Sequence, residues 1–202
     1  MDSGDWDGLS IGLLGGSFNP AHEGRLHISH GALDSLGLDV LWWLVSPQNP
    51  LKPVTGMADF ETRMEAARGL IDDRRIHVSD LERRLETRYT ADTVRALIER
   101  YPGAAFVWIM GADNLAQIDR WKDWTAIFAA LPIAVFDRPT YSDAALDCAA
   151  AKRFASSRID ACRARELAGS APPAWVFVRG NLHGASATEI RRAGANIDNN
   201  HH

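Results

Sequence analysis

The sequence has 202 residues, of which 22 are Lys or Arg and 26 are Asp or Glu, so its formal net charge is −4. This length suits one domain with a full hydrophobic core, and the acidic balance excludes a protein that attracts nucleic acid by its overall charge. The two cysteines form no C-x-x-C pair, so the sequence predicts neither a zinc site nor a disulfide framework. We expect one domain over residues 1–202, with 1–8 and 196–202 as loose ends and no metal held by the protein itself.

The N-terminal eight residues are acidic and lack the basic and then apolar pattern of a secretory leader. No apolar run approaches the roughly 18 residues that a membrane span needs. We therefore expect a cytoplasmic protein without a membrane or nucleic-acid partner, and we leave open whether it forms a homo-oligomer.

Residues 11–29, with the sequence IGLLGGSFNPAHEGRLHIS, predict a buried strand, a tight glycine turn and a helix. The N-terminus of a helix carries unpaired N–H groups and the positive end of the helix dipole, so phosphate binds there readily. His22 and Arg25 are three residues apart, which places them on one side of this helix start. The stretch is neither a Walker A loop nor a G-x-G-x-x-G fingerprint. By itself it is as consistent with a plain strand-to-helix connection as with a phosphate site.

The rest of the chain alternates between short apolar runs and helical patterns. Further strands are predicted at 40–45, 76–78, 104–110, 133–136 and 175–178, and helices at 58–71, 89–100 and 142–168. Alternation of this kind predicts an α/β fold, namely a Rossmann-like, doubly wound, mainly parallel sheet with helices on both faces.

Several polar and aromatic residues follow these strands or begin these helices, and each allows two interpretations. Thr90 suits a helix N-cap as well as a ligand contact, and Asp113 suits a helix cap as well as a ribose contact. Of Trp121 and Trp124, we expect one in the core and one facing a ligand, because an aromatic face can stack on a planar heterocycle. Ser186 begins a capping-box pattern, which predicts one more helix start.

Five stretches in a fixed order resemble the bacterial nicotinate-nucleotide adenylyltransferases, a family of HxGH nucleotidylyltransferases, over residues 11–192. They are GGSFNPAHEG, VSPQNPLKP, YTADT, GADN with the following W-x-x-W, and SATEIR. The resemblance implies transfer of AMP from ATP to nicotinate mononucleotide, which gives nicotinate adenine dinucleotide and pyrophosphate. It also implies Mg²⁺ carried by ATP as a cofactor and no covalent intermediate.

The resemblance also assigns roles to residues. His22 and Arg25 take the catalytic positions. The ATP-binding positions are Gly15, Gly16, Ser17, Phe18, His22, Gly111, Asp113, Ser186, Thr188 and Arg191. The positions that bind the acceptor substrate are Asn19, Lys52, Thr90, Asp92 and Trp121.

Arg25 departs from the family pattern, which has a second histidine at this position. Arginine cannot give up a proton at neutral pH, but it stabilises developing negative charge well. Phosphoryl-type transfer depends mainly on positioning and electrostatics, so we expect activity to be retained, although it could be reduced. His27 is an imperfect substitute, because five helical steps place it about 140° around the helix from His22.

Two other functions remain open. Another nucleotidylyltransferase of the same fold, such as one that acts on phosphopantetheine, would share the first and last motifs, whereas YTADT and W-x-x-W favour the nicotinate enzyme. A catalytically weakened nucleotide-binding protein is the second alternative, and Arg25 alone motivates it.

Overall fold

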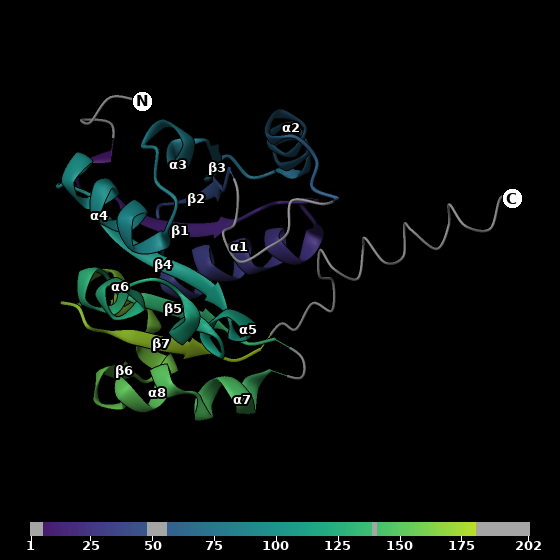
Figure 1. The fold of residues 1–202 in the computed structure, drawn as a ribbon. Helices are drawn as coiled ribbons and strands as arrows, with labels where there is room; N and C mark the ends of the chain where they lie inside the picture. Colours follow the sequence, from purple (N-terminus) through teal and green to yellow (C-terminus); the bar gives the residue numbers. More distant parts are fainter. Residues whose placement is uncertain (1–5, 48–55, 139–140, 181–202) are drawn as a thin grey trace, which may run out of the picture.

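The computed structural model describes residues 6–47, 56–138 and 141–180, and in these residues a seven-stranded sheet forms the centre of the protein (Figure 1). All neighbouring strands are parallel, in the order β3-β2-β1-β4-β5-β7-β6. The strands are β1 (Ser10–Gly16), β2 (Val40–Val45), β3 (Ile76–Ser79), β4 (Ala105–Gly111), β5 (Ile133–Phe136), β6 (Arg158–Ile159) and β7 (Trp175–Val178). No helix in the described ranges is both long enough and apolar enough to cross a membrane.

Helices cover both faces of the sheet. One face is covered by α1 (Glu23–Leu36), α2 (Phe60–Leu70) and the 3-10 helix η4 (Ala161–Gly169). The other face is covered by α4 (Thr90–Arg100), α6 (Trp124–Ala130), α7 (Ser142–Asp147) and α8 (Ala149–Arg153). Shorter pieces complete the connections: α3 (Leu81–Arg84), α5 (Ala112–Leu115), η2 (Ile118–Arg120) and η3 (Ala155–Ser157).

The sheet separates two hydrophobic cores, and adjacent residues of one strand enter different cores because side chains alternate along a strand. Trp42 packs edge-on against Trp6 in the first core, with ring centroids 5.0 Å apart. Trp43 packs against Phe18 in the second core, also at 5.0 Å, and its indole N–H donates to Ser29 Oγ at 2.7 Å. Strands buried on both faces read as continuous apolar runs, which is why the sequence VLWWLV predicts β2 so clearly.

The chain changes direction across the sheet at β1. From β1 it continues to β2 and β3 on one side, and it then returns to β4 on the other side. In open parallel sheets, ligands bind outside the carboxyl ends of the strands at such a switch point. The loops after β1 and β4 are therefore the expected place for a site.

The predicted strands are confirmed to within a residue or two at their ends, but the structure differs from the other predictions in several places. The stretch 142–168 is not one or two long helices, because it contains several short pieces and the edge strand β6, which pairs with Trp175 and Val176. Helices α3, α5 and α6 lie where no element was predicted. Thr90 is not the N-cap of α4, because Tyr89 has the extended backbone of that position and Thr90 already lies in the helix.

Candidate functional site

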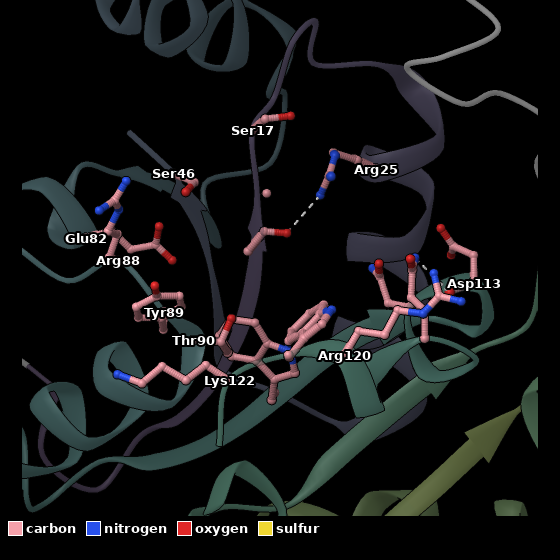
Figure 2. Close-up of a pocket in the computed structure, with 16 residues that line it drawn as sticks. Ser17, Arg25, Ser46, Glu82, Arg88, Tyr89, Thr90, Asp113, Arg120 and Lys122 are labelled. Carbon is pink, nitrogen blue, oxygen red and sulfur yellow. Dashed lines mark hydrogen bonds between the residues drawn. The ribbon is translucent and has the colours of Figure 1, made fainter. Parts of the chain in front are cut away.

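A pocket of about 430 Å³ opens at the carboxyl ends of the central strands (Figure 2). Gly15, Gly16 and Ser17 line it from the end of β1, Ser46 from the end of β2, and Asp113 from the turn after β4. The pocket thus lies at the switch point of the sheet. Its remaining lining residues are Arg25, Glu82, Arg88, Tyr89, Thr90, Trp108, Asn114, Gln117, Arg120, Trp121 and Lys122.

The two glycines at the end of β1 lie close against neighbouring side chains. A Cβ on Gly15 would lie 2.8 Å from the Trp108 ring, and a Cβ on Gly16 would lie 2.7 Å from Arg25 Cζ. Both distances are shorter than side-chain carbons tolerate, so any larger residue would displace its neighbour. The Arg25 guanidinium consequently rests directly on the backbone of the glycine turn.

Arg25 extends from the first turn of α1 and is held by the turn itself. Its Nη1 donates to Gly15 O at 3.3 Å, and its guanidinium carbon lies 4.5 Å from the centre of the Phe18 ring. Within the described part of the chain, its buried Nε has no hydrogen-bond acceptor. The pKa of Arg25 is lowered to about 10, mainly by burial. The Asp113 carboxylate opposes this effect, and the Arg138 cation adds to it. Arg25 is therefore still a cation at neutral pH, and it lines the pocket.

Asp113 takes part in an ion pair that the sequence did not reveal. Arg138 Nη1 donates to Asp113 Oδ2 at 2.6 Å, and both side chains are about three-quarters buried. Asp113 does not cap α5, because the N-cap position belongs to Gly111 and no side chain bonds there. The second carboxylate oxygen of Asp113 still has acceptor capacity for a hydroxyl group.

Cations outnumber carboxylates around the pocket. Figure 2 shows Glu82, Arg88 and Tyr89 on one side and Asp113 and Arg120 on the other. The four lining cations are Arg25, Arg88, Arg120 and Lys122, against the two carboxylates Glu82 and Asp113. Neither Arg88 nor Arg120 pairs with a carboxylate in the ranges that the structure describes. A cationic pocket of this kind favours anionic ligands such as phosphates.

Glu82 is a buried carboxyl group in the pocket wall. It lies in α3 and is only 8% exposed. Burial raises the pKa of Glu82 to about 7, although a hydrogen bond with the Ser46 side chain acts in the opposite direction. A carboxyl group of this kind titrates in the physiological range and is typical of functional sites.

The opposite end of the pocket carries aromatic side chains beside the start of α4. Tyr89, Thr90 and Trp121 line it, and Lys122 Nζ lies 4.6 Å from the centre of the Tyr89 ring. Trp124 faces elsewhere and packs edge-on against Phe128 and Phe154. Trp121 thus lines the pocket and Trp124 does not, while both pack partly buried against the first core; a ligand contact of Trp121 stays a prediction.

The structure gathers seven of the residues singled out from the sequence around this pocket: Gly15, Gly16, Ser17, Arg25, Thr90, Asp113 and Trp121. Four others, Lys52, Ser186, Thr188 and Arg191, lie outside the described residues, as does the capping-box pattern that begins at Ser186.

Four more predicted positions do not line the pocket. His22 is the N-cap of α1, and Gly111 ends β4. The Phe18 ring lies in the core under Arg25. Asp92 lies in the first turn of α4, 3.5 Å from Arg95 and 4.0 Å from Lys122.

Asn19 and His27 have other surroundings. Asn19 donates to Gly56 O at 3.1 Å and accepts from Ala58 N–H at 3.2 Å, so it joins the glycine turn to the segment before α2. His27 lines a separate hollow of about 270 Å³ together with Phe136 and Arg179. His27 is not among the residues that line the pocket of Arg25.

Sequence reasoning missed Glu82, Arg88, Arg120, Arg138 and the buried Arg63. Arg88 directly precedes the YTADT stretch, and that position was a usable signal. The others carry no local pattern, because their surroundings depend on segments that are distant in the sequence. Within the described ranges, no group of three or more His, Cys, Asp or Glu side chains could hold a metal ion.

Comparison with known proteins gives concordant results. A cytidylyltransferase-like family model matches residues 13–193. A probable nicotinate-nucleotide adenylyltransferase of Parvibaculum lavamentivorans is 50% identical over 187 residues, which cover 93% of this chain and 93% of that protein. A protein of the same description from Ruegeria sp. is 47% identical over 93% of this chain and 98% of its own length.

The fold also matches a solved structure at low sequence identity. The Plasmodium falciparum nicotinic acid mononucleotide adenylyltransferase complexed with NaAD superposes with a TM-score of 0.71 and 17% identity. The match covers 91% of this chain and 83% of that one. This likeness concerns the fold alone.

Proposed function

The chain belongs to the cytidylyltransferase-like family and, within it, to the nicotinate-nucleotide adenylyltransferases, and from this premise we propose that it transfers AMP from ATP to nicotinate mononucleotide. ATP enters as its Mg²⁺ complex. A phosphate oxygen of the mononucleotide attacks the α-phosphorus of ATP. The bond from that phosphorus to the bridging oxygen breaks, and pyrophosphate leaves.

The reaction needs little general acid or general base catalysis from the protein. The attacking phosphate is already anionic at neutral pH, and pyrophosphate is an adequate leaving group. The protein must hold two anionic substrates in line and stabilise the charge on the transferring group. A permanent cation in place of the second motif histidine can meet the electrostatic part of this demand.

The observation that carries the proposal is the position of Arg25. Its guanidinium lies on the glycine turn after β1, close to Asp113 after β4 and next to the N-terminus of α1. We assign the triphosphate to this end of the pocket and a ribose of ATP to Asp113. We assign the mononucleotide to the end lined by Tyr89, Thr90 and Trp121, where the tryptophan can stack on the pyridine ring.

The test is release of pyrophosphate from ATP with one acceptor at a time: nicotinate mononucleotide, nicotinamide mononucleotide or phosphopantetheine. We expect release with nicotinate mononucleotide and Mg²⁺ and none when Mg²⁺ is chelated. Release with phosphopantetheine instead would identify another adenylyltransferase of this fold. Calorimetric binding of ATP without turnover of any acceptor would identify a nucleotide-binding protein that has lost activity. This is the second candidate function, because Arg25 replaces the second histidine of the motif.

A further inference from the structure

Arg63, a residue of α2, is a buried cation whose hydrogen bonds all go to the main chain. Its side chain is 2% exposed. Nη1 donates to Ser17 O at 2.6 Å and to Ser46 O at 2.7 Å, and Nη2 donates to Pro47 O at 2.9 Å. Nε donates to Ala58 O at 3.0 Å. One guanidinium group therefore joins three separate segments of backbone.

No carboxylate forms an ion pair with Arg63 in the part of the chain that the structure describes. Burial lowers the pKa of Arg63, and Asp59 only partly opposes this effect. Carbonyl dipoles, rather than a counter-ion, thus compensate for the cost of burying the charge. An arrangement of this kind depends on the exact positions of the carbonyl groups, so the guanidinium in turn fixes those positions.

Two of the acceptor residues belong to the pocket. Ser17 ends the glycine turn after β1, and Ser46 follows β2; both line the pocket (Figure 2). A further bond joins the two loops, because Ser46 N–H donates to Gly16 O at 2.8 Å. Glu82 lines the pocket on the same side as Ser46 (Figure 2).

We propose that Arg63 is a positioning residue for the transfer reaction, which sets the spacing between the glycine turn and the Ser46 wall of the pocket. The inference rests on the proposed function, in which the glycine turn binds the triphosphate. Displacement of reacting groups by about 1 Å can lower a rate by about a hundredfold. A residue outside the pocket that fixes the backbone of two pocket loops can therefore change the rate of the chemical step. The guanidinium itself touches neither substrate.

The experiment compares four variants of the full chain in the pyrophosphate assay, at saturating concentrations of both substrates. Arg63→Ala removes the guanidinium group and its hydrogen bonds to the main chain. Arg63→Lys keeps the positive charge but lacks the planar guanidinium donors. Met64→Ala truncates the adjacent, equally buried residue of α2, which packs in the core and contacts neither loop through hydrogen bonds. Arg68→Ala removes an exposed arginine of the same helix.

We expect Arg63→Ala to lower kcat at least tenfold more than Met64→Ala does, when both are assayed well below their melting temperatures. Arg63→Lys should fold if Arg63→Ala does not, and its kcat should fall by a similar factor. Arg68→Ala should match the parent protein. Low, non-denaturing concentrations of guanidinium chloride should raise the kcat of Arg63→Ala, whereas equal potassium chloride should not, because free guanidinium can occupy the vacated cavity.

Equal kcat values for the folded Arg63 variants and Met64→Ala would overturn the inference, because the arginine would then contribute only to stability. A parent protein that releases no pyrophosphate with any acceptor would instead overturn the proposed function. The two failures are therefore distinguishable in one set of measurements.

Discussion

Glu82→Gln should make the protein more stable at neutral and alkaline pH but not at acid pH. Folding raises the pKa of Glu82 from its ordinary value of 4.5 to about 7, because the carboxyl group is buried. Below about pH 4.5 the group is protonated in both the folded and the unfolded states, so its ionisation does not change the free energy of unfolding. Between about pH 4.5 and 7 the unfolded state ionises more readily than the folded state, and the folded state loses stability. Above about pH 7 the loss is complete.

The size of this effect follows from the two pKa values. Their difference, multiplied by about 1.4 kcal/mol for each tenfold change in an equilibrium constant, gives a cost of about 3 kcal/mol. For a domain of this size, that corresponds to roughly 6–12 °C in melting temperature. Glutamine keeps the shape of the side chain and a hydrogen-bonding group for Ser46, but it cannot ionise.

The measurement is thermal unfolding of the parent protein, Glu82→Gln and the exposed control Glu99→Gln across this pH range. Titrations elsewhere in the protein are common to all three, so the difference between the parent and Glu82→Gln isolates one carboxyl group. The melting temperature of Glu82→Gln should exceed that of the parent increasingly as the pH rises from about 5 to about 8. Constant differences over this range would refute the assignment of a raised pKa to Glu82.

Three predictions concern activity. His22→Ala should lower turnover tenfold or more, since loss of about 1.4 kcal/mol of transition-state stabilisation gives that factor; unchanged turnover in the folded variant would contradict its catalytic role. Arg25→Ala should be slower than both the parent and Arg25→His, and Arg25→His should add pH dependence to the initial rate between about pH 5 and 8. Equal rates for Arg25→Ala and the parent would contradict the charge model. Trp121→Ala should raise KM for the mononucleotide more than KM for ATP. Equal increases in the two KM values, with a large fall in melting temperature, would show that Trp121 serves the core instead.

Most of the fold could be predicted because its strands are buried on both faces. Runs such as VLWWLV and AFVWIMG contain no polar residue, so the apolar pattern identifies each strand clearly. Strand β6 escaped prediction because two residues, one of them the exposed Arg158, carry no periodicity. Its existence depends on pairing with β7, which lies farther along the chain.

The site could be predicted only where function depends on a local pattern. The glycine turn and the helix start at residues 15–25 are local, and the structure places Arg25 directly on that turn. Arg63 binds carbonyl oxygens from segments up to 46 positions away, and Arg138 pairs with Asp113 across 25 positions. No neighbouring residues signal such contacts, because main-chain acceptors are present at every position of a sequence.

The division of the interior by the sheet has a consequence for how substitutions combine. Trp42 and Trp43 are neighbours in the sequence, yet they belong to cores on opposite faces of the sheet and share no side-chain partner in those cores. Free-energy changes from well-separated sites add, whereas those from touching residues do not. Truncations on opposite faces should therefore be additive, for example Leu33→Ala with Leu97→Ala, and pairs within one face should be coupled. Each core can then accumulate substitutions during evolution largely independently of the residues in the other core.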